Sequence, residues 1–365
     1  QLVGRYPDHA LSETAIVWLI QYYASSEIDW QLRRQSQVVA DVVVAQPPQI
    51  AADGTVKPAG FAQPVPQLPA APPVVGGPLQ AGPHTAIVAG PQPVDRATRA
   101  VNLAQLLQRS RPGLFAEPQV QFPMAVAYRL SGMPREAERF YHRLSAGQIL
   151  TNWGRCAEAE LWLASGRGFA PKPVCKCRLV SSRPHLDGHL DDPAWGKAER
   201  LELSSALHDD GTWPATAMLA CDDEFLFLAA SCRKAPGAQY PAATSPRPRD
   251  PPLDDYDRLD VLIDLDRDYA TFYRLTIDYR GWTGEACAGN VHWDPVWYVA
   301  QHETATDWTV EAAIPLAELT PRSPTATDVW AVGVQRIVPK VGIQAYTRPA
   351  SVVPRGESFA LLMFE

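Results

Sequence analysis

The second half of the chain alternates between apolar and polar residues over many short segments, and this pattern restricts the fold more than any other feature. In RLDVLIDLD, residues 258–266, the side chains of Val261, Ile263 and Leu265 are predicted to share the core face of a strand. Such segments recur at intervals typical of packed antiparallel sheets, so we predict a β-sandwich over residues 184–365. The further segments are TAMLACDDEFLFLAASC, TFYRLTIDYRG, DWTVEAAIPLAEL, VWAVGVQRIV and SFALLMFE.

The first half has the apolar spacing of helices. Within a helical segment at residues 1–45, Leu11–Leu32 predicts an amphipathic helix or a helix pair broken at SSE. Helical hairpins are predicted over 95–170, where Asp95 is a helix-capping residue. In Phe122–Leu144 small alanines alternate with aromatic residues, and this hairpin resembles a tetratricopeptide repeat, a plain helical hairpin being the alternative. A single repeat cannot bury its own face, so further repeats or the sandwich would have to cover it.

Two linkers separate these parts. Residues 46–94 hold twelve of the 35 prolines, which lack the N–H donor and fix the backbone, so this segment is predicted to be a disordered linker. A second linker is predicted at 171–183. The expected fold class is therefore α+β, with helices and a sandwich in separate domains.

Charge and hydropathy exclude two classes of partner. The net charge is −7 and no run of lysine and arginine is present, which argues against nucleic-acid binding. Apolar stretches such as Thr14–Ile20 are far shorter than a membrane span of about 20 residues. No signal peptide is evident in the first thirty residues.

Several motifs in the second half occur in the order found in one known family. The region from Pro184 to Glu365 resembles a family 9 carbohydrate-binding module of the DOMON-like sandwich group. The resemblance implies a non-catalytic sugar-binding domain. It also implies that the Asp-Gly and Asp-Pro-Ala-Trp stretch is the first corner of the sandwich, with Trp195 as a buried plug. The motifs are LDGHLDDPAWGKA, ACDDEFLFLAASC, DRLDVLIDLD, WTVEAAIPLAEL and SFALLMFE.

The resemblance also implies which residues hold the sugar. Asp260 lies on the strand face opposite Val261 and coincides with the family's acidic ligand, and Arg274 coincides with its sugar-binding arginine. Tyr346 stands where one of two clamping tryptophans is found. The alternative is that Asp260 and Arg274 form only a cross-strand ion pair.

The sequence departs from the family at the second clamping tryptophan. Asp254 occupies that place, with Tyr256 as the nearest aromatic residue. Trp282 and Trp293 could supply a substitute stacking platform, whereas Trp297 is expected to fill the core. Losing one aromatic wall removes about 1 kcal/mol of stacking energy, so the sugar site is altered relative to the family.

No cofactor is predicted. Cys175 and Cys177 form a CxC pair, but a tetrahedral zinc site needs four ligands and the other four cysteines are scattered, so disulfides or buried thiols are expected. Acidic turns such as Asp222–Asp223 leave room for a structural calcium ion. A haem-binding DOMON-like domain is a minor alternative that would need an axial ligand such as Met218.

Function follows from these assignments. We expect glycan binding by the sandwich, tethered to a helical scaffold that has a protein partner, and no enzymatic activity, because no catalytic motif accompanies the acid pairs. The alternative is a structural or interaction protein with a degenerate sugar site. Glycan binding implies a secreted, periplasmic or cell-surface protein.

Overall fold

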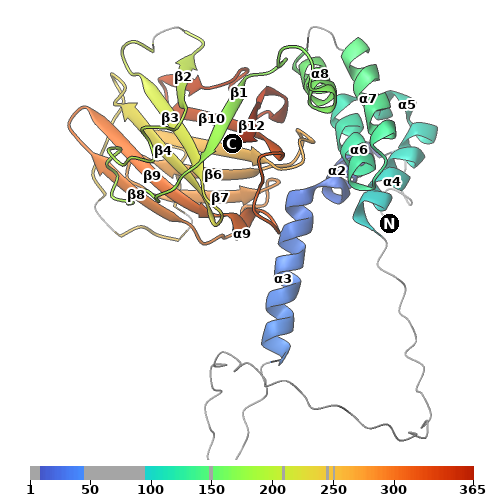
Figure 1. The fold of residues 1–365 in the computed structure, drawn as a ribbon, viewed down its shortest axis with the longest axis horizontal. Coiled ribbons are helices and arrows are strands. Elements are labelled where there is room, and N and C mark those ends of the chain that lie inside the picture. The colour runs from blue at the N-terminus through green and yellow to red at the C-terminus, as the bar shows by residue number, and fades with distance from the viewer. Residues whose placement is uncertain (1–8, 45–94, 148–150, 208–209, 244–245, 250) are drawn as a thin grey trace, which may run out of the picture. The chain divides into compact units, whose positions relative to one another are not determined.

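The structure is a computed structural model, shown in Figure 1, and the helices and strands outside Leu32–Val94 form one compact unit. Leu32–Val94 is assigned to a second unit. The linker predicted at 46–94 lies outside the described residues and stays a prediction. The described residues are 9–44, 95–147, 151–207, 210–243, 246–249 and 251–365.

Helices occupy the first half of the chain, as predicted. The Leu11–Leu32 segment belongs to two helices that are broken at Ser25, within the predicted SSE. Asp95 caps the next helix, since its carboxylate accepts a hydrogen bond from the Thr98 amide at 3.2 Å. The helices are α2 Ala10–Ala24, α3 Ser26–Val44, α4 Arg96–Ser110, α5 Pro112–Phe115, α6 Pro118–Leu130, α7 Pro134–Gly147 and α8 Asn152–Ser165.

Strands occupy the second half and form two layers. One layer has the order β7-β6-β5-β10 and continues to β12 and β11, the other has the order β2-β3-β4-β9-β8, and β11 joins them by pairing with β2. The pairs are antiparallel apart from those of β1, which lies parallel to β12 and β3. The elements are β1 Val174–Leu179, β2 Arg200–Ser205, β3 Ala215–Cys221, β4 Phe225–Arg233, β5 Arg258–Asp264, β6 Tyr273–Asp278, β7 Thr283–Cys287, β8 Tyr298–Glu303, β9 Asp307–Pro315, α9 Leu316–Leu319, β10 Val329–Val338, β11 Gly342–Ala345, η1 Gly356–Ser358 and β12 Ala360–Phe364.

The space between the layers is the main core. Val261 and Ile263 of β5 are fully buried in it, and Leu265 packs against its margin, as the alternation predicts. Trp308 of β9 lies in the same core. The α+β fold class with a C-terminal sandwich is therefore confirmed.

The helices cover part of the outer face of the β5–β10 layer, meaning the face turned away from the core. Phe122 of α6 and Tyr141 of α7 share one apolar cluster with Leu262 of β5, Ala331 of β10 and Phe359 before β12. The sandwich thus covers the side of the helical hairpin that a single repeat would leave exposed. The likeness of this hairpin to a tetratricopeptide repeat stays a prediction.

The strand count exceeds the prediction. β1 falls within 171–183, the segment predicted as a linker, and that prediction is wrong for Val174–Leu179. Strands β2, β7, β8 and β11 were also not predicted, because they are short and their residues are only partly apolar. The domain boundaries themselves remain predictions.

The first corner of the sandwich has the structure that the sequence implies. Trp195 is 4% exposed, and its indole Nε1 donates to the Glu311 carboxylate at 2.7 Å. Asp187 accepts a hydrogen bond from the His189 amide at 2.8 Å, and Asp192 accepts one from the His185 amide at 2.9 Å. These aspartates therefore hold turns, as expected for the Asp-Gly and Asp-Pro stretch.

Candidate functional site

Antiparallel pairing of β5 and β6 brings Asp260 and Arg274 together on the outer face. Arg274 Nε and Nη2 donate to the two carboxylate oxygens of Asp260 at 3.2 and 2.9 Å. Thr276 Oγ1 and Gln335 Nε2 donate to the same carboxylate at 2.7 and 3.1 Å. Asp260 has no exposed surface that water could reach. Arg274, Thr276 and Gln335 therefore provide the hydrogen bonds that its two carboxylate oxygens accept.

Arg274 remains accessible. Its side chain is 28% exposed, and the residue opposite it on β7 is the small Ala286. A guanidinium carries five N–H donors. Two of them bind Asp260, and the rest have no partner among the residues that the structure describes. The predicted cross-strand ion pair is thus present, and it leaves three donors of Arg274 for a ligand.

Tyr346 does not lie beside this pair. Ala345 pairs with Gln335 and shares the outer face with Asp260, so Tyr346 takes the opposite side. The Tyr346 ring packs against the core between the layers, and its hydroxyl donates to the Val174 carbonyl at 3.3 Å. The structure therefore places the expected clamping residue on the core side.

The other predicted aromatic residues surround an arginine. The guanidinium carbon of Arg280 lies 3.5 Å from the ring centroid of Tyr256 and 3.8 Å from that of Trp282. Asp278 holds this arginine in place, because Arg280 Nε and Nη2 both donate hydrogen bonds to Asp278 Oδ2. Tyr256 and Trp282 therefore stack on a protein cation, and they do not form a wall next to Arg274.

Asp254 and Trp293 also lie apart from the predicted site. The Asp254 side chain is 92% exposed and pairs with Arg258 at 3.1 Å. Trp293 is 8% exposed and lies against Tyr273 in the core, with ring centroids 4.6 Å apart. Of the seven predicted site residues, the structure brings Asp260 together with Arg274, and Tyr256 together with Trp282 around Arg280.

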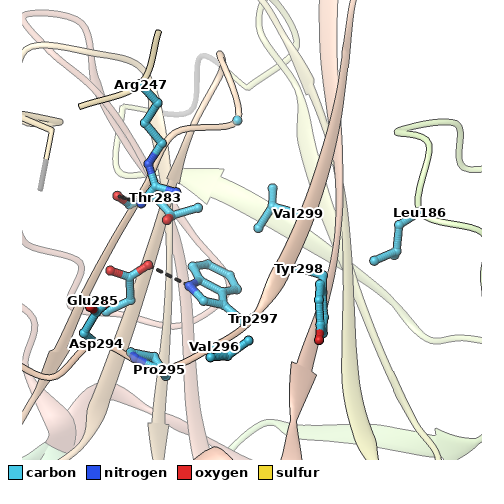
Figure 2. A pocket seen from close by; sticks show the side chains of 11 residues that line it. Leu186, Arg247, Thr283, Glu285, Asp294, Pro295, Val296, Trp297, Tyr298 and Val299 are labelled. Atoms are coloured by element: carbon cyan, nitrogen blue, oxygen red, sulfur yellow. Dashed lines mark hydrogen bonds between the residues drawn. The ribbon is translucent and has the colours of Figure 1, made fainter. Parts of the chain in front are cut away.

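The structure contains an aromatic groove that the sequence did not indicate, and we call it the edge groove. It has a volume of about 610 Å³ and lies where β7, at the edge of one layer, faces β8, at the edge of the other (Figure 2). Trp297, which was expected in the core, packs against the margin of the core with part of its side chain and also lines this groove. The lining residues are Leu186, Arg247, Gly281, Thr283, Glu285, Asp294, Pro295, Val296, Trp297, Tyr298 and Val299.

Four buried carboxylates gather where α3 begins beside the loop after β5. Oxygen atoms of Glu27, Asp264 and Asp266 lie within 4.8 Å of one another, and within the described chain these three could hold a cation. Burial and the neighbouring carboxylates raise the pKa of Glu27. Burial, and to a smaller extent the nearby charge of Asp266, raises the pKa of Asp268 to about 8. Sequence could not reveal this cluster because Glu27 is far from the others along the chain.

The residues considered for zinc, calcium and haem are the cysteines, the acidic turn at Asp222 and Met218. All six cysteines are free and buried, and burial raises the pKa of Cys175 to about 12. Asp222 accepts hydrogen bonds from the amides of Glu224 and Phe225 at 2.8 and 2.7 Å, as a turn residue does. Met218, required by the haem alternative, is 4% exposed in a small apolar cluster with Trp195.

Comparison with known proteins returns matches only among solved structures. No protein-family model and no curated protein matches the chain. A family 9 carbohydrate-binding module from Caldicellulosiruptor kristjanssonii in complex with cellotriose has 16% identity and a TM-score of 0.41, covering 53% of this chain and 93% of its own. The complex of such a module with glucose has 15% identity and a TM-score of 0.39, covering 52% and 95%. A structure from Bacteroides uniformis has 11% identity and a TM-score of 0.41, covering 53% and 100%.

A membrane-spanning helix among the described residues would have to be long and apolar. No helix among them is both long and apolar enough to cross a bilayer.

Proposed function

We propose that the C-terminal sandwich binds carbohydrate without catalysing a reaction, and that Arg274 contacts the sugar hydroxyls. One observation supports this proposal more than any other. Arg274 is fixed on the outer face and keeps three N–H donors that have no partner within the described residues. A fixed fork of donors suits vicinal hydroxyl groups, because it loses little freedom on binding.

Asp260 is a positioning residue in this proposal. Its carboxylate is enclosed and accepts from Thr276 and Gln335 as well as from Arg274, so it has no capacity left for a ligand. Its charge holds the guanidinium in one orientation. Asp260 and Arg274 are the two positions that the resemblance to the module family implies as an acidic ligand and a sugar-binding arginine.

The proposed site has no aromatic wall from the predicted residues, and this affects its strength. Tyr346 packs on the core side, and Asp254 stands in place of the second clamping tryptophan. Each missing stacking contact weakens binding by about 1 kcal/mol, or a factor of about five. Binding by Arg274 should therefore be weaker than in a module with two aromatic walls.

The test combines a glycan array with titration calorimetry on the full chain. We expect at least one neutral oligosaccharide to bind, and Arg274→Ala to weaken that binding about tenfold or more, because a charge-assisted hydrogen bond contributes about 1.5–3 kcal/mol. Arg178→Ala, which removes an exposed arginine on β1, is the matched control. Equal affinities for all three proteins would reject Arg274 as a sugar contact.

A second candidate function is a protein-interaction scaffold formed by the helices. The outward side of α2 carries Leu11 and Trp18, which are 61% and 53% exposed, and the Trp18 ring stacks on Tyr22. Exposed apolar side chains grouped on one element are typical of interaction sites. If this face binds a partner, Trp18→Ala should remove that partner from a pull-down with the full chain, and equal recovery by both proteins would reject the face.

Location outside the cytoplasm is part of the main proposal, because polymeric glycans are met at the cell surface or beyond it. Fractionation of cells that express the natural full-length protein tests it. Recovery only in the cytoplasmic fraction would contradict this part.

A further inference from the structure

The edge groove combines features that suit a small polar ligand. It opens between β7 and β8, which terminate the strand order of the described sheet. Its volume of about 610 Å³ is within the range of about 300–1,000 Å³ that small-molecule sites occupy. Residues from both layers and from the loop between the two strands line it, so its walls rest on the rigid sandwich.

The aromatic surface of the groove is fixed in place. Trp297 Nε1 donates to Glu285 Oε1 at 2.6 Å, which sets the orientation of the indole (Figure 2). Tyr298, the next residue, is 51% exposed, and Val296 is 60% exposed. A held indole loses little freedom on binding and offers a flat apolar surface to the C–H groups of a sugar ring.

Hydrogen-bonding groups of both kinds flank this surface. The second oxygen of Glu285 has no partner within the described chain, and the Asp294 side chain is 68% exposed and pairs with Arg249 at 3.2 Å. Arg247 donates to the Thr283 carbonyl at 3.1 Å, which holds its guanidinium at the rim. Carboxylates accept hydrogen bonds from hydroxyl groups, and a guanidinium donates to them.

We infer that the edge groove is a second carbohydrate site, separate from Arg274, that takes one neutral sugar ring. The ring stacks on Trp297 with Tyr298, which also lies near Phe225, at its margin, and its hydroxyls donate to Glu285 and Asp294 and accept from Arg247. Glu285 and Asp294 offset the charges of Arg247 and of Arg249, which pairs with Asp294, so the groove has no excess positive charge to select an anionic ligand such as a phosphate or a uronic acid. Two separate sites would let one sandwich hold a glycan at two points, which raises avidity without new contacts.

Tyr298→Ala tests this inference, because the exposed side chain can be removed without opening the core. Phe169→Ala is the matched control, since Phe169 is 99% exposed and is not part of the groove. The probes are glucose, galactose, mannose and xylose and their neutral oligomers, titrated into the full chain by calorimetry. Thermal unfolding of each variant confirms that the fold is intact.

We expect Tyr298→Ala to weaken binding of at least one probe about three- to tenfold, with Phe169→Ala leaving that binding unchanged. Glu285→Gln should weaken it as well, because the amide keeps one acceptor but loses the charge. Unchanged binding in Tyr298→Ala would overturn the groove, as would a single site that both Tyr298→Ala and Arg274→Ala abolish. If only Arg274→Ala loses sugar binding, the result supports the proposed function and rejects the edge groove as a sugar site. If only Tyr298→Ala loses sugar binding, the result supports the edge groove and rejects Arg274 as a sugar contact.

Discussion

A buried charge cluster between the helices and the sandwich gives the sharpest prediction for stability. Glu160 of α8 pairs with Arg129 of α6 and with Arg267 in the loop after β5. The Glu160 side chain is 3% exposed and that of Arg267 is 13% exposed. Burial disfavours the Glu160 charge, but Arg267 and Arg129 outweigh this effect and lower its pKa.

Glu160→Gln replaces the negative carboxylate by a neutral amide, so the guanidinium groups of Arg129 and Arg267 lose their shared anionic partner. Removing one partner of a buried ion pair costs about 3–5 kcal/mol. The carbonyls of Asp266 and Val329 still accept hydrogen bonds from the two arginines, so we expect the lower end, about 3 kcal/mol. At about 2 °C per kcal/mol for a domain of this size, the unfolding midpoint should fall by roughly 6 °C.

Differential scanning calorimetry at pH 7 measures this shift. Glu136→Gln is the matched control, because its pair with Arg139 is exposed on α7, with side-chain exposures of 42% and 71%, and should change the midpoint by less than about 1 °C. A fall below 2 °C in Glu160→Gln would refute the assignment of this cluster as a main stabilising contact between helices and sandwich.

Three further perturbations test other parts of the account by thermal unfolding. Gly188→Ala should destabilise the sandwich by more than about 1 kcal/mol, because φ is +84° and the added Cβ would lie 2.5 Å from a backbone carbon of β8; a neutral effect would contradict the close approach. Glu311→Ala should cost about 2–4 kcal/mol, because it leaves the Trp195 indole and two backbone amides without an acceptor, whereas Glu311→Gln should cost less; equal costs would reject the hydrogen bonds as the cause. Arg322 lowers the pKa of Asp328 to about 2, so this pair stabilises the fold above pH 4 and the contribution is lost as the pH falls toward 2. The difference in midpoint between wild type and Asp328→Asn should shrink from pH 6 to pH 3, and a constant difference would contradict that origin.

The strands that the sequence predicted are those with a clear two-residue period. β5 and β6 alternate in sequence, and the core side chains Leu259, Val261 and Ile263 of β5 and Tyr273, Leu275 and Ile277 of β6 follow from that pattern. β7 and β8 are edge strands with few buried side chains, so the hydrophobic pattern that reveals a central strand is missing from them. The edge groove, which they form, was therefore not predictable.

The site was predictable only where it depends on one hairpin. Asp260 and Arg274 lie on adjacent strands, so a correct alternation places them on one face. Tyr346 depends on the register of β11 against β10, and a shift of one residue changes the face to which a side chain points. Contacts such as that of Glu160 with Arg267 join distant segments, and no local pattern indicates them.

A crystal structure of the full chain with its best-binding oligosaccharide tests the central claim most directly. We predict a sugar hydroxyl oxygen about 2.7–3.2 Å from an N–H group of Arg274 that does not bind Asp260, with the contacts between Arg274 and Asp260 unchanged. A bound sugar that leaves Arg274 facing only water would contradict it.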